Sequence, residues 1–198
     1  MPLDPVTLDG TRVRLEPLTP AHEEPLLAAA ADGELWNLVV TVVPSRVTIG
    51  DYLARAFRAQ AAGHELPFAI RDRATDRIVG TTRYRSIELA HRRVEIGSTW
   101  LAASAQRTAI NTEAKFLLLR HAFEILGCNR VELVTDVLNA RSRAAIERLG
   151  AKQEGIHRAH MVMPGGRIRD SVYYSIVGPE WPAVKANLST RLAARAMR

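Results

Sequence analysis

Hydrophobic and polar positions change their period several times along this chain. Between Val6 and Leu18 they alternate, which is typical of a strand with one buried face. Residues 20–32 and the segment from Thr48 to Gly63 carry apolar residues at helical spacing instead. The pattern predicts a strand followed by two helices in the first third of the chain.

The centre of the chain returns to the period of strands. Segments 66–71, 78–87 and 93–101 are joined by short polar turns, which predicts an antiparallel meander. Apolar positions from Ala114 to Leu126 then follow helical spacing, and Gly127 ends this helix.

The last third adds a strand at 130–137, a short helix at 139–150 and two strands around the turn at 164–166. No linker rich in proline, serine or glycine divides the chain. We therefore expect one α+β domain over residues 1–198, in the order βααβββαβαββ, with a helical tail over about 181–198.

Composition narrows the class of protein. The chain has 198 residues, of which 47% are hydrophobic and 24% charged, so it can bury a core and wholesale disorder is excluded. Uncharged stretches such as 35–45 are far shorter than the roughly 20 apolar residues of a membrane span, so no membrane partner is expected. The start, Met-Pro-Leu-Asp-Pro, lacks the features of a secretory signal, which predicts a cytoplasmic protein.

The net charge of +6 comes from 27 Lys and Arg against 21 Asp and Glu. The two signs are interspersed except in the tail, where the cations Lys185, Arg191, Arg195 and Arg198 have no acidic neighbours. We interpret the tail as a solvated amphipathic helix, because no aromatic residues alternate with its cations as they do in nucleic-acid arms. Nucleic acid is therefore not expected as a partner.

The cysteine and histidine pattern predicts no disulfide and no metal site. Cys128 is the one cysteine, and we interpret it as a buried residue without a chemical role. His157 and His160 have an odd spacing, which would place their rings on opposite faces of a strand. No metal ligands are therefore predicted.

Candidate chemistry begins where the strand at 93–101 ends. A loop of small residues leads from it into Gln106–Thr112, the start of the next helix. The unpaired N–H groups and the positive dipole of a helix start can bind a pyrophosphate. Asn111 or Thr112 followed by Glu113 is also simply how a helix is capped, so the loop alone leaves both interpretations open.

A second polar segment, Asn139 to Ser142, stands between the strand at 130–137 and the short helix. Asn139 suits the N-cap of that helix, with Ser142 in its first turn. Capping alone and a functional role both fit this pattern.

The order of elements and these two segments resemble the GNAT superfamily of acetyl-CoA-dependent N-acetyltransferases. More narrowly, they are similar to its RimJ/RimL branch, the ribosomal-protein N-terminal acetyltransferases and their relatives. The resemblance is carried by the loop 106–111, by Asn-x-x-Ser at 139–142 and by Glu-Arg-Leu-Gly-Ala at 147–151. Further similar segments lie at 10–18, 112–115, 130–133 and 180–182. The resemblance implies a GNAT (acyl-CoA N-acyltransferase) fold, with a mixed, mostly antiparallel sheet that is splayed at the cofactor site.

The resemblance also implies how the donor, acetyl-CoA, is held. In GNAT enzymes the pantetheine arm lies along a splayed strand, here Ser98 to Leu101, and the pyrophosphate lies on the amides of the following loop. The implied cofactor-binding residues are Thr99, Trp100, Leu101, Gln106, Arg107, Thr108, Ala109, Ile110, Asn111, Thr112, Asn139 and Ser142. Arg107, Arg141 or Arg143 are candidates for the 3′-phosphate, with solvated surface as the alternative.

The phosphate loop departs from the family pattern Gln/Arg-x-x-Gly-x-Gly/Ala, because Ala109 and Asn111 replace both glycines. A positive φ at 109 would strain an alanine by roughly 1 kcal/mol, whereas a need for a small side chain alone would not. Loss of the glycines leaves open a second function, a non-catalytic acyl-CoA sensor.

Glu95 and Ser142 are the catalytic candidates. Glu95 lies in the donor strand and suits a general base for the attacking amine. Its alternative is an ion pair with Arg83 or Arg93 across the sheet. Ser142 matches the family position that returns a proton to the leaving thiolate.

The identity of the general acid stays open. Tyr173 and Tyr174 are available on the late strand, where packing is the commoner role of paired tyrosines.

The implied activity is transfer of an acetyl group from acetyl-CoA to a primary amine, by direct attack in a ternary complex. A protein N-terminal amine titrates near 8 and a lysine near 10.4, so the former loses its proton more easily. A small-molecule amine is the alternative acceptor, and Trp36, Tyr52 and Glu88 are candidates for the acceptor cleft. The oligomeric state, a homodimer included, stays open.

Overall fold

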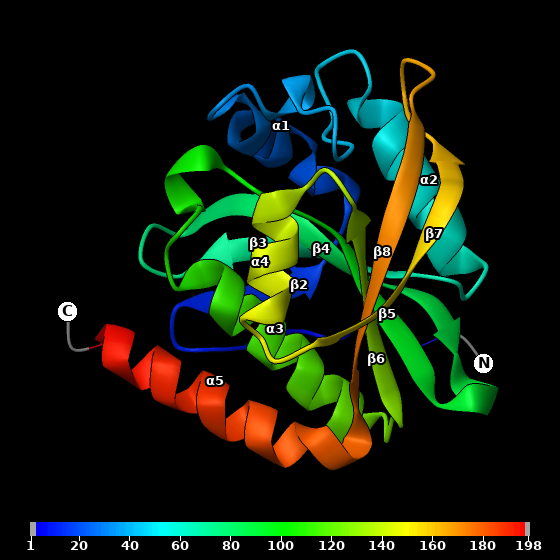
Figure 1. The fold of residues 1–198 in the computed structure, drawn as a ribbon. Coiled ribbons are helices and arrows are strands. Elements are labelled where there is room, and N and C mark those ends of the chain that lie inside the picture. Colours follow the sequence, from blue (N-terminus) through cyan, green and yellow to red (C-terminus); the bar gives the residue numbers. More distant parts are fainter. Residues whose placement is uncertain (1–2, 197–198) are drawn as a thin grey trace.

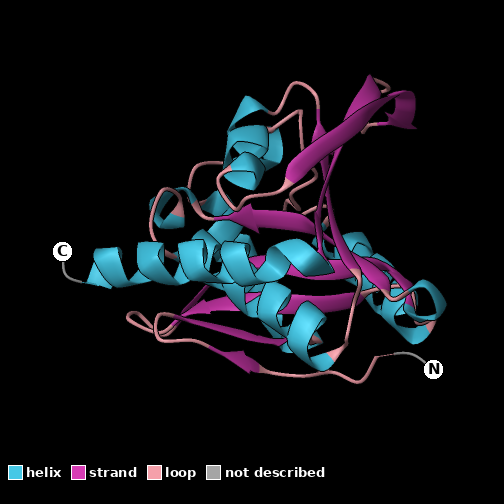
Figure 2. Ribbon diagram, turned by 60° about the horizontal axis from the view of Figure 1, so that its bottom comes forward, coloured by secondary structure: helices cyan, strands magenta, loops and turns pink. Residues whose placement is uncertain are grey.

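The computed structural model describes residues 3–196, which form one eight-stranded sheet with helices packed on both faces (Figures 1 and 2). The strand order is β1-β2-β3-β4-β5-β6-β8-β7. All neighbours are antiparallel except β5 and β6, which are parallel. The strands are β1 (Leu8–Asp9), β2 (Val13–Pro17), β3 (Leu66–Asp72), β4 (Arg77–Glu88), β5 (Arg93–Leu101), β6 (Arg130–Asp136), β7 (Lys152–Val162) and β8 (Ile168–Val177).

Helices α2 and α3 lie on opposite faces of the sheet. The indole N–H of Trp100 in β5 donates to the hydroxyl of Tyr52 in α2, while the neighbouring Thr99 contacts Lys115 in α3. Adjacent side chains of a strand point to opposite faces, so these two contacts place the helices. The α-helices are α1 (Glu23–Ala31), α2 (Ile49–Ala61), α3 (Ile110–Arg120), α4 (Ala140–Glu147) and α5 (Trp181–Ala196).

The predicted order of elements is confirmed, with two corrections. The segment Val6 to Leu18 holds two strands, because the chain turns at Gly10 and β2 pairs back on β1. The helix predicted to reach Leu126 is α-helical only to Arg120 and continues as a π-helical turn, His121–Ile125.

The amphipathic tail is α5, and its apolar face packs against α3. Val184 and Leu188 are buried, and the Trp181 ring stacks on Phe123 of the π-helical turn that follows α3, with 5.3 Å between centroids. The tail is therefore half packed and half solvated. Arg198 lies outside the described residues.

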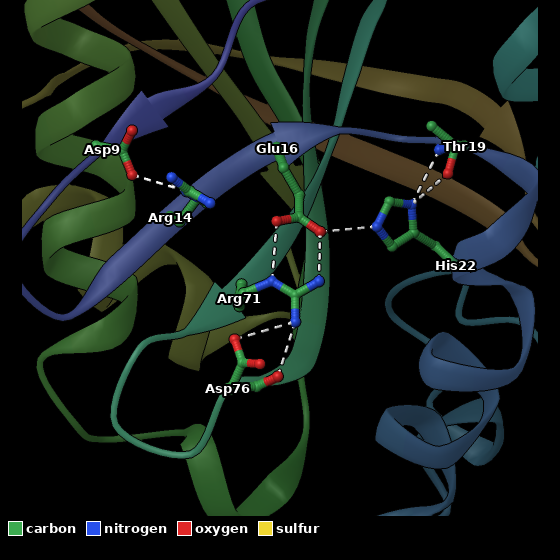
Figure 3. A network of polar contacts seen from close by, with 7 residues as sticks. All are labelled: Asp9, Arg14, Glu16, Thr19, His22, Arg71 and Asp76. Carbon is green, nitrogen blue, oxygen red and sulfur yellow. Dashed lines mark hydrogen bonds and ion pairs between the residues drawn. The ribbon is translucent and has the colours of Figure 1, made fainter.

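A network of polar contacts connects β2, β3 and the 3₁₀ turn before α1 (Figure 3). Arg71 of β3 donates from Nε and Nη2 to the two carboxylate oxygens of Glu16 in β2, at 2.9 and 2.7 Å. The ring of His22, in the 3₁₀ turn before α1, lies 2.9 Å from the same carboxylate. The network joins two strands to the first helix.

The hairpin of β7 and β8 corrects one expectation from the sequence. His157 and His160 are not on opposite faces, since their rings meet edge to face with centroids 5.5 Å apart. The pairing with β8 shifts register between His157 and Met161, and Ala159 has a φ of +49°. This bulge rotates the chain by one position. Among residues 3–196, no group of three or more His, Cys, Asp or Glu side chains is arranged to hold a metal ion.

Candidate active site

The two parallel strands at the centre of the sheet separate halfway along. Their pairing covers Arg93 to Glu95 of β5 and ends at the partners Glu95 and Glu132. Beyond that point β5 continues to Leu101 and β6 to Asp136 without pairing to each other. The predicted splay of the sheet is therefore present, and residues 96–101 have one free edge.

The start of α3 stands next to this free edge and offers main-chain donors. Within the described part of the chain, no hydrogen-bond acceptor meets the N–H groups of residues 107, 108, 109, 111 and 112. The N–H of Gln106 donates to the carbonyl of Ala103, and that of Ile110 donates to Thr108 Oγ1. Five of the seven amides predicted to hold a pyrophosphate are thus available, and two are not.

The cap of α3 differs from the predicted one. Neither Asn111 nor Thr112 caps the helix, because it begins at Ile110, and the hydroxyl of Thr108 accepts the first N–H. Glu113 points away from its own helix and accepts the N–H groups of Thr11, Arg12 and Val13, at 2.8–2.9 Å. It holds the turn between β1 and β2.

The replaced glycines impose no strain at position 109. Ala109 has φ −74° and ψ −16°, an ordinary helical conformation, and the positive φ of the loop lies at Arg107, at +62°. Alanine therefore fits, and the structural reason for proposing a non-catalytic sensor is removed.

Two side chains of the donor strand are engaged inside the protein. Trp100 bonds Tyr52, and Thr99 Oγ1 receives Lys115 Nζ at 2.5 Å. Lys115 is 6% exposed, and its burial lowers the pKa of the ammonium group to about 7. Thr99 and Trp100 therefore have main-chain groups, not side chains, to offer a ligand at their free edge.

Helix α4 brings two predicted residues to the same region. Asn139 caps it, as expected, by accepting the N–H of Ser142 at 3.0 Å. The Ser142 hydroxyl has no hydrogen-bond partner among the described residues, so it is available to a ligand. Arg141 reaches back to the Gln106 side chain at 2.8 Å, which in turn donates to the Leu101 carbonyl. This chain of contacts ties α4 to the end of β5.

Arg143 and the two tyrosines have different surroundings. Arg143 donates to the hydroxyl of Tyr174, which is fully buried and also bonds Glu147. Tyr173 points to the other face of the sheet and packs on the His157 ring, with centroids 4.1 Å apart. Tyr174 is thus a packing residue, as predicted, and Tyr173 lies on the face of Glu95.

Glu95 stands at the point where the strands separate, and only 8% of its surface is exposed. Its partner is Arg85, with Nη1 3.2 Å from Oε1, and neither Arg83 nor Arg93 as expected. Burial raises the pKa of the Glu95 carboxyl, and the carboxylates of Glu132 and Glu65 add to the increase, whereas Arg85 opposes it. A carboxyl in this state exchanges protons more readily near neutral pH than an exposed one.

A groove of about 450 Å³ opens in front of Glu95 on the face of α2. The charged and aromatic residues that line it include Glu65, Arg85, Glu88, Arg93, Glu95, Glu132 and Tyr173. Of the three residues predicted for the acceptor cleft, Glu88 lines this groove. Tyr52 contacts Trp100 instead, and Trp36 does not line the groove. The groove and the amides of α3 are on opposite faces of β5, and the pairing of β5 with β6 ends between them.

Sequence reasoning missed Arg85, Lys115 and the role of Glu113. For the two residues of α3 a signal existed, because Glu113 lies three and four positions from the apolar Ile110 and Leu117. Lys115 likewise lies three and four positions from the apolar Leu118 and Leu119. A charged residue inside an apolar helical stripe indicates a buried polar contact. No such signal marks Arg85.

Comparison with known proteins decides the family. Residues 12–152 match the family model described as "Acetyltransferase (GNAT) domain". The chain belongs to the GNAT acetyltransferase family. The predicted family, fold and acyl donor are thereby confirmed, since GNAT enzymes use acetyl-CoA as co-substrate.

Individual relatives agree with this family. A Bacillus subtilis (strain 168) protein named "Putative ribosomal N-acetyltransferase YdaF" is 35% identical over 108 residues, which are 54% of this chain and 58% of that protein. A crystal structure named as a putative acetyltransferase from T. thermophilus has a TM-score of 0.85 at 35% identity, covering 97% of this chain and 100% of the other. A GCN5-related N-acetyltransferase from Brucella melitensis has a TM-score of 0.85 at 33% identity, covering 96% and 86%.

Proposed function

We propose that this GNAT protein transfers the acetyl group of acetyl-CoA to the α-amine of a protein N-terminus. The observation that carries the proposal is the row of unpaired amides at the start of α3 beside the free edge of β5. A pyrophosphate suits the amides, and an extended pantetheine arm suits the unpaired strand edge.

The proposed reaction needs no covalent intermediate on the enzyme. The amine loses a proton to Glu95, directly or through one water, and its nitrogen bonds to the thioester carbon. Main-chain N–H groups of β5 are suited to stabilise the oxyanion that forms. The C–S bond then breaks, and the Ser142 hydroxyl gives a proton to the thiolate. The second proton that the attacking nitrogen loses, carried through solvent, restores that hydroxyl.

One argument favours an α-amine over a lysine side chain, and another favours a protein as its carrier. An α-amine titrates near 8, so a single carboxylate such as Glu95 suffices to deprotonate it. The relative from Bacillus subtilis is named for ribosomal N-acetylation, which suggests a ribosomal protein as the acceptor. With that acceptor we also propose that residues 1–198 work as one domain in the cytoplasm. No helix within residues 3–196 has both the length and the hydropathy to cross a membrane.

The test is release of free thiol from acetyl-CoA across a panel of N-terminal peptides, lysine-containing peptides with blocked N-termini, polyamines and aminoglycosides. We expect turnover with N-terminal peptides, and mass spectrometry should place the acetyl group on the α-amine. Turnover only with polyamines or aminoglycosides would assign the small-molecule alternative. Binding of acetyl-CoA without any turnover, while an active relative works in parallel, would refute the transferase.

A further inference from the structure

We propose that Gly97 and Arg85 are positioning residues that direct the carboxylate of Glu95 along β5 toward the donor stretch 98–101. The inference rests on the proposed function, because it assigns their role within the same site.

Gly97 makes room for the carboxylate. It is the next residue on the same face of β5 as Glu95, since side chains alternate along a strand. A Cβ added at position 97 would lie 2.5 Å from Glu95 Oε1 and 3.0 Å from Arg85 Cδ. Gly97 does not have a positive φ, so this glycine supplies space and not conformational freedom.

The space at Gly97 sets the direction of Glu95. The carboxylate fills the volume that a side chain at 97 would take, so it leans forward along the strand. Ser98 comes next, with a φ of +47°, and the pairing of β5 with β4 is irregular over this stretch. The carboxylate therefore lies close to the residues proposed to run beside the thioester.

Arg85 holds one side of the carboxylate and leaves the other free. It stands opposite Glu95 in the register of β4 and β5, and its Nη1 lies 3.2 Å from Oε1. Its Nε donates to Glu65 at 3.2 Å, and Glu65 is anchored in turn by the buried Arg83 at 2.8 Å. Among the described residues, no donor meets Glu95 Oε2. This oxygen is thus able to accept the proton of an amine.

Gly97→Ala is the direct test. The nearest obstruction is the flexible end of Glu95, so the variant should fold and displace the carboxylate. We expect kcat to fall by about 10- to 100-fold, because small misplacements of a reacting group have effects of this size. Acetyl-CoA affinity, measured by calorimetry, should change less than about twofold on the same argument. The matched control is Gly155→Ala in β7, where an added Cβ meets nothing within 4 Å, and it should retain wild-type kinetics.

A second readout does not depend on turnover. The protein is labelled with ¹³C at the glutamate carboxyls, and the Glu95 resonance is assigned by its loss in Glu95→Gln. In Arg85→Met this resonance should titrate at a higher pH, because the variant removes a neighbouring cation that lowers the pKa of Glu95. Arg85→Lys should restore part of the difference. The resonance should also shift in Gly97→Ala and not in Gly155→Ala.

The outcomes separate the two proposals. If Glu95→Gln loses activity but Gly97→Ala does not, or if the Glu95 resonance is unchanged in both the Gly97 and the Arg85 variants, the positioning role is overturned. If the wild type acetylates no amine, or Glu95→Gln keeps its rate, the proposed function or its base is wrong. The carboxyl titration still decides the positioning role in that case.

Discussion

Glu16 and Glu95 are both strand glutamates that contact an arginine on the neighbouring strand, but their surroundings differ. Arg71 meets both oxygens of Glu16, and His22 adds a third contact (Figure 3). Glu95 receives a single contact from Arg85, at 3.2 Å. The pKa of Glu16 is lowered to about 2, chiefly by the hydrogen bonds from Arg71, whereas burial raises the pKa of Glu95.

The difference in surroundings suits two different roles for one residue type in one sheet. Several charge-assisted hydrogen bonds keep a carboxylate ionised and stabilise the fold. A buried carboxylate with one such bond keeps a free oxygen and a raised pKa, which are the properties of a general base. Glu16 is therefore expected to matter for stability, and Glu95 for activity.

The largest expected effect is the loss of activity in Glu95→Gln. We expect kcat to fall by about 100-fold or more, since the amide cannot take a proton from the amine. The free energy of unfolding should not fall, because a buried carboxylate with one contact is replaced by a neutral group of the same shape. Steady-state kinetics and urea unfolding measure both. Glu23→Gln, on the exposed surface of α1, is the control. A kcat for Glu95→Gln within threefold of the wild type would contradict the role of Glu95 as the base.

The next effect separates stability from chemistry. Glu113→Ala removes the acceptor for the N–H groups of Thr11, Arg12 and Val13, so the free energy of unfolding should fall by about 3 kcal/mol. Glu113→Gln keeps one carbonyl oxygen and should lose less. Urea unfolding tests this, and unchanged stability would show that the turn between β1 and β2 does not need this carboxylate.

The sequence predicted the fold far better than the contacts of Glu95. Strands β3, β4 and β5 lie within one residue of their predicted bounds, because polar turns separate their apolar patterns. The turn at Gly10 was missed, since alternation of apolar and polar residues continues across it.

The partner of Glu95 depends on register, which the sequence does not show. Irregularities after Thr81 and after Arg85 shift the pairing of β4 with β5, and only between them does Arg85 stand opposite Glu95. Without the first shift, the pairing of Thr81 with Trp100 would continue and place Ser86 opposite Glu95. Positive φ values at Ser98 and Arg107, neither a glycine, likewise leave no mark in the sequence.

Glu16→Gln should show a smaller effect than Glu113→Ala, and a characteristic pH dependence. The folded pKa of Glu16 lies below its ordinary value of 4.5, so its contribution is fully present above about pH 4.5 and is lost as the pH falls toward 2. At pH 7 we expect a loss of about 1 to 2 kcal/mol in the free energy of unfolding. Urea unfolding between pH 2.5 and 7 should show a weaker pH dependence for the variant. A tenfold fall in kcat would instead place Glu16 in the catalytic machinery.

The smallest effect is expected from His22→Phe, which separates the contribution of His22 to the low pKa of Glu16 from that of Arg71. A phenyl ring takes the place of the imidazole. Glu16 then loses one of its three contacts, and the Thr19 N–H loses its acceptor, His22 Nδ1. We expect a loss of about 1 kcal/mol in the free energy of unfolding at pH 7. Because Arg71 remains and is the larger cause of the lowered pKa, Glu16 should still titrate below 4.5 but at a higher pH than in the wild type. As the pH is lowered, the free energy of unfolding should therefore begin to fall at a higher pH than in the wild type, with kcat unchanged. If the fall begins at the same pH, the low pKa of Glu16 is due to Arg71 alone.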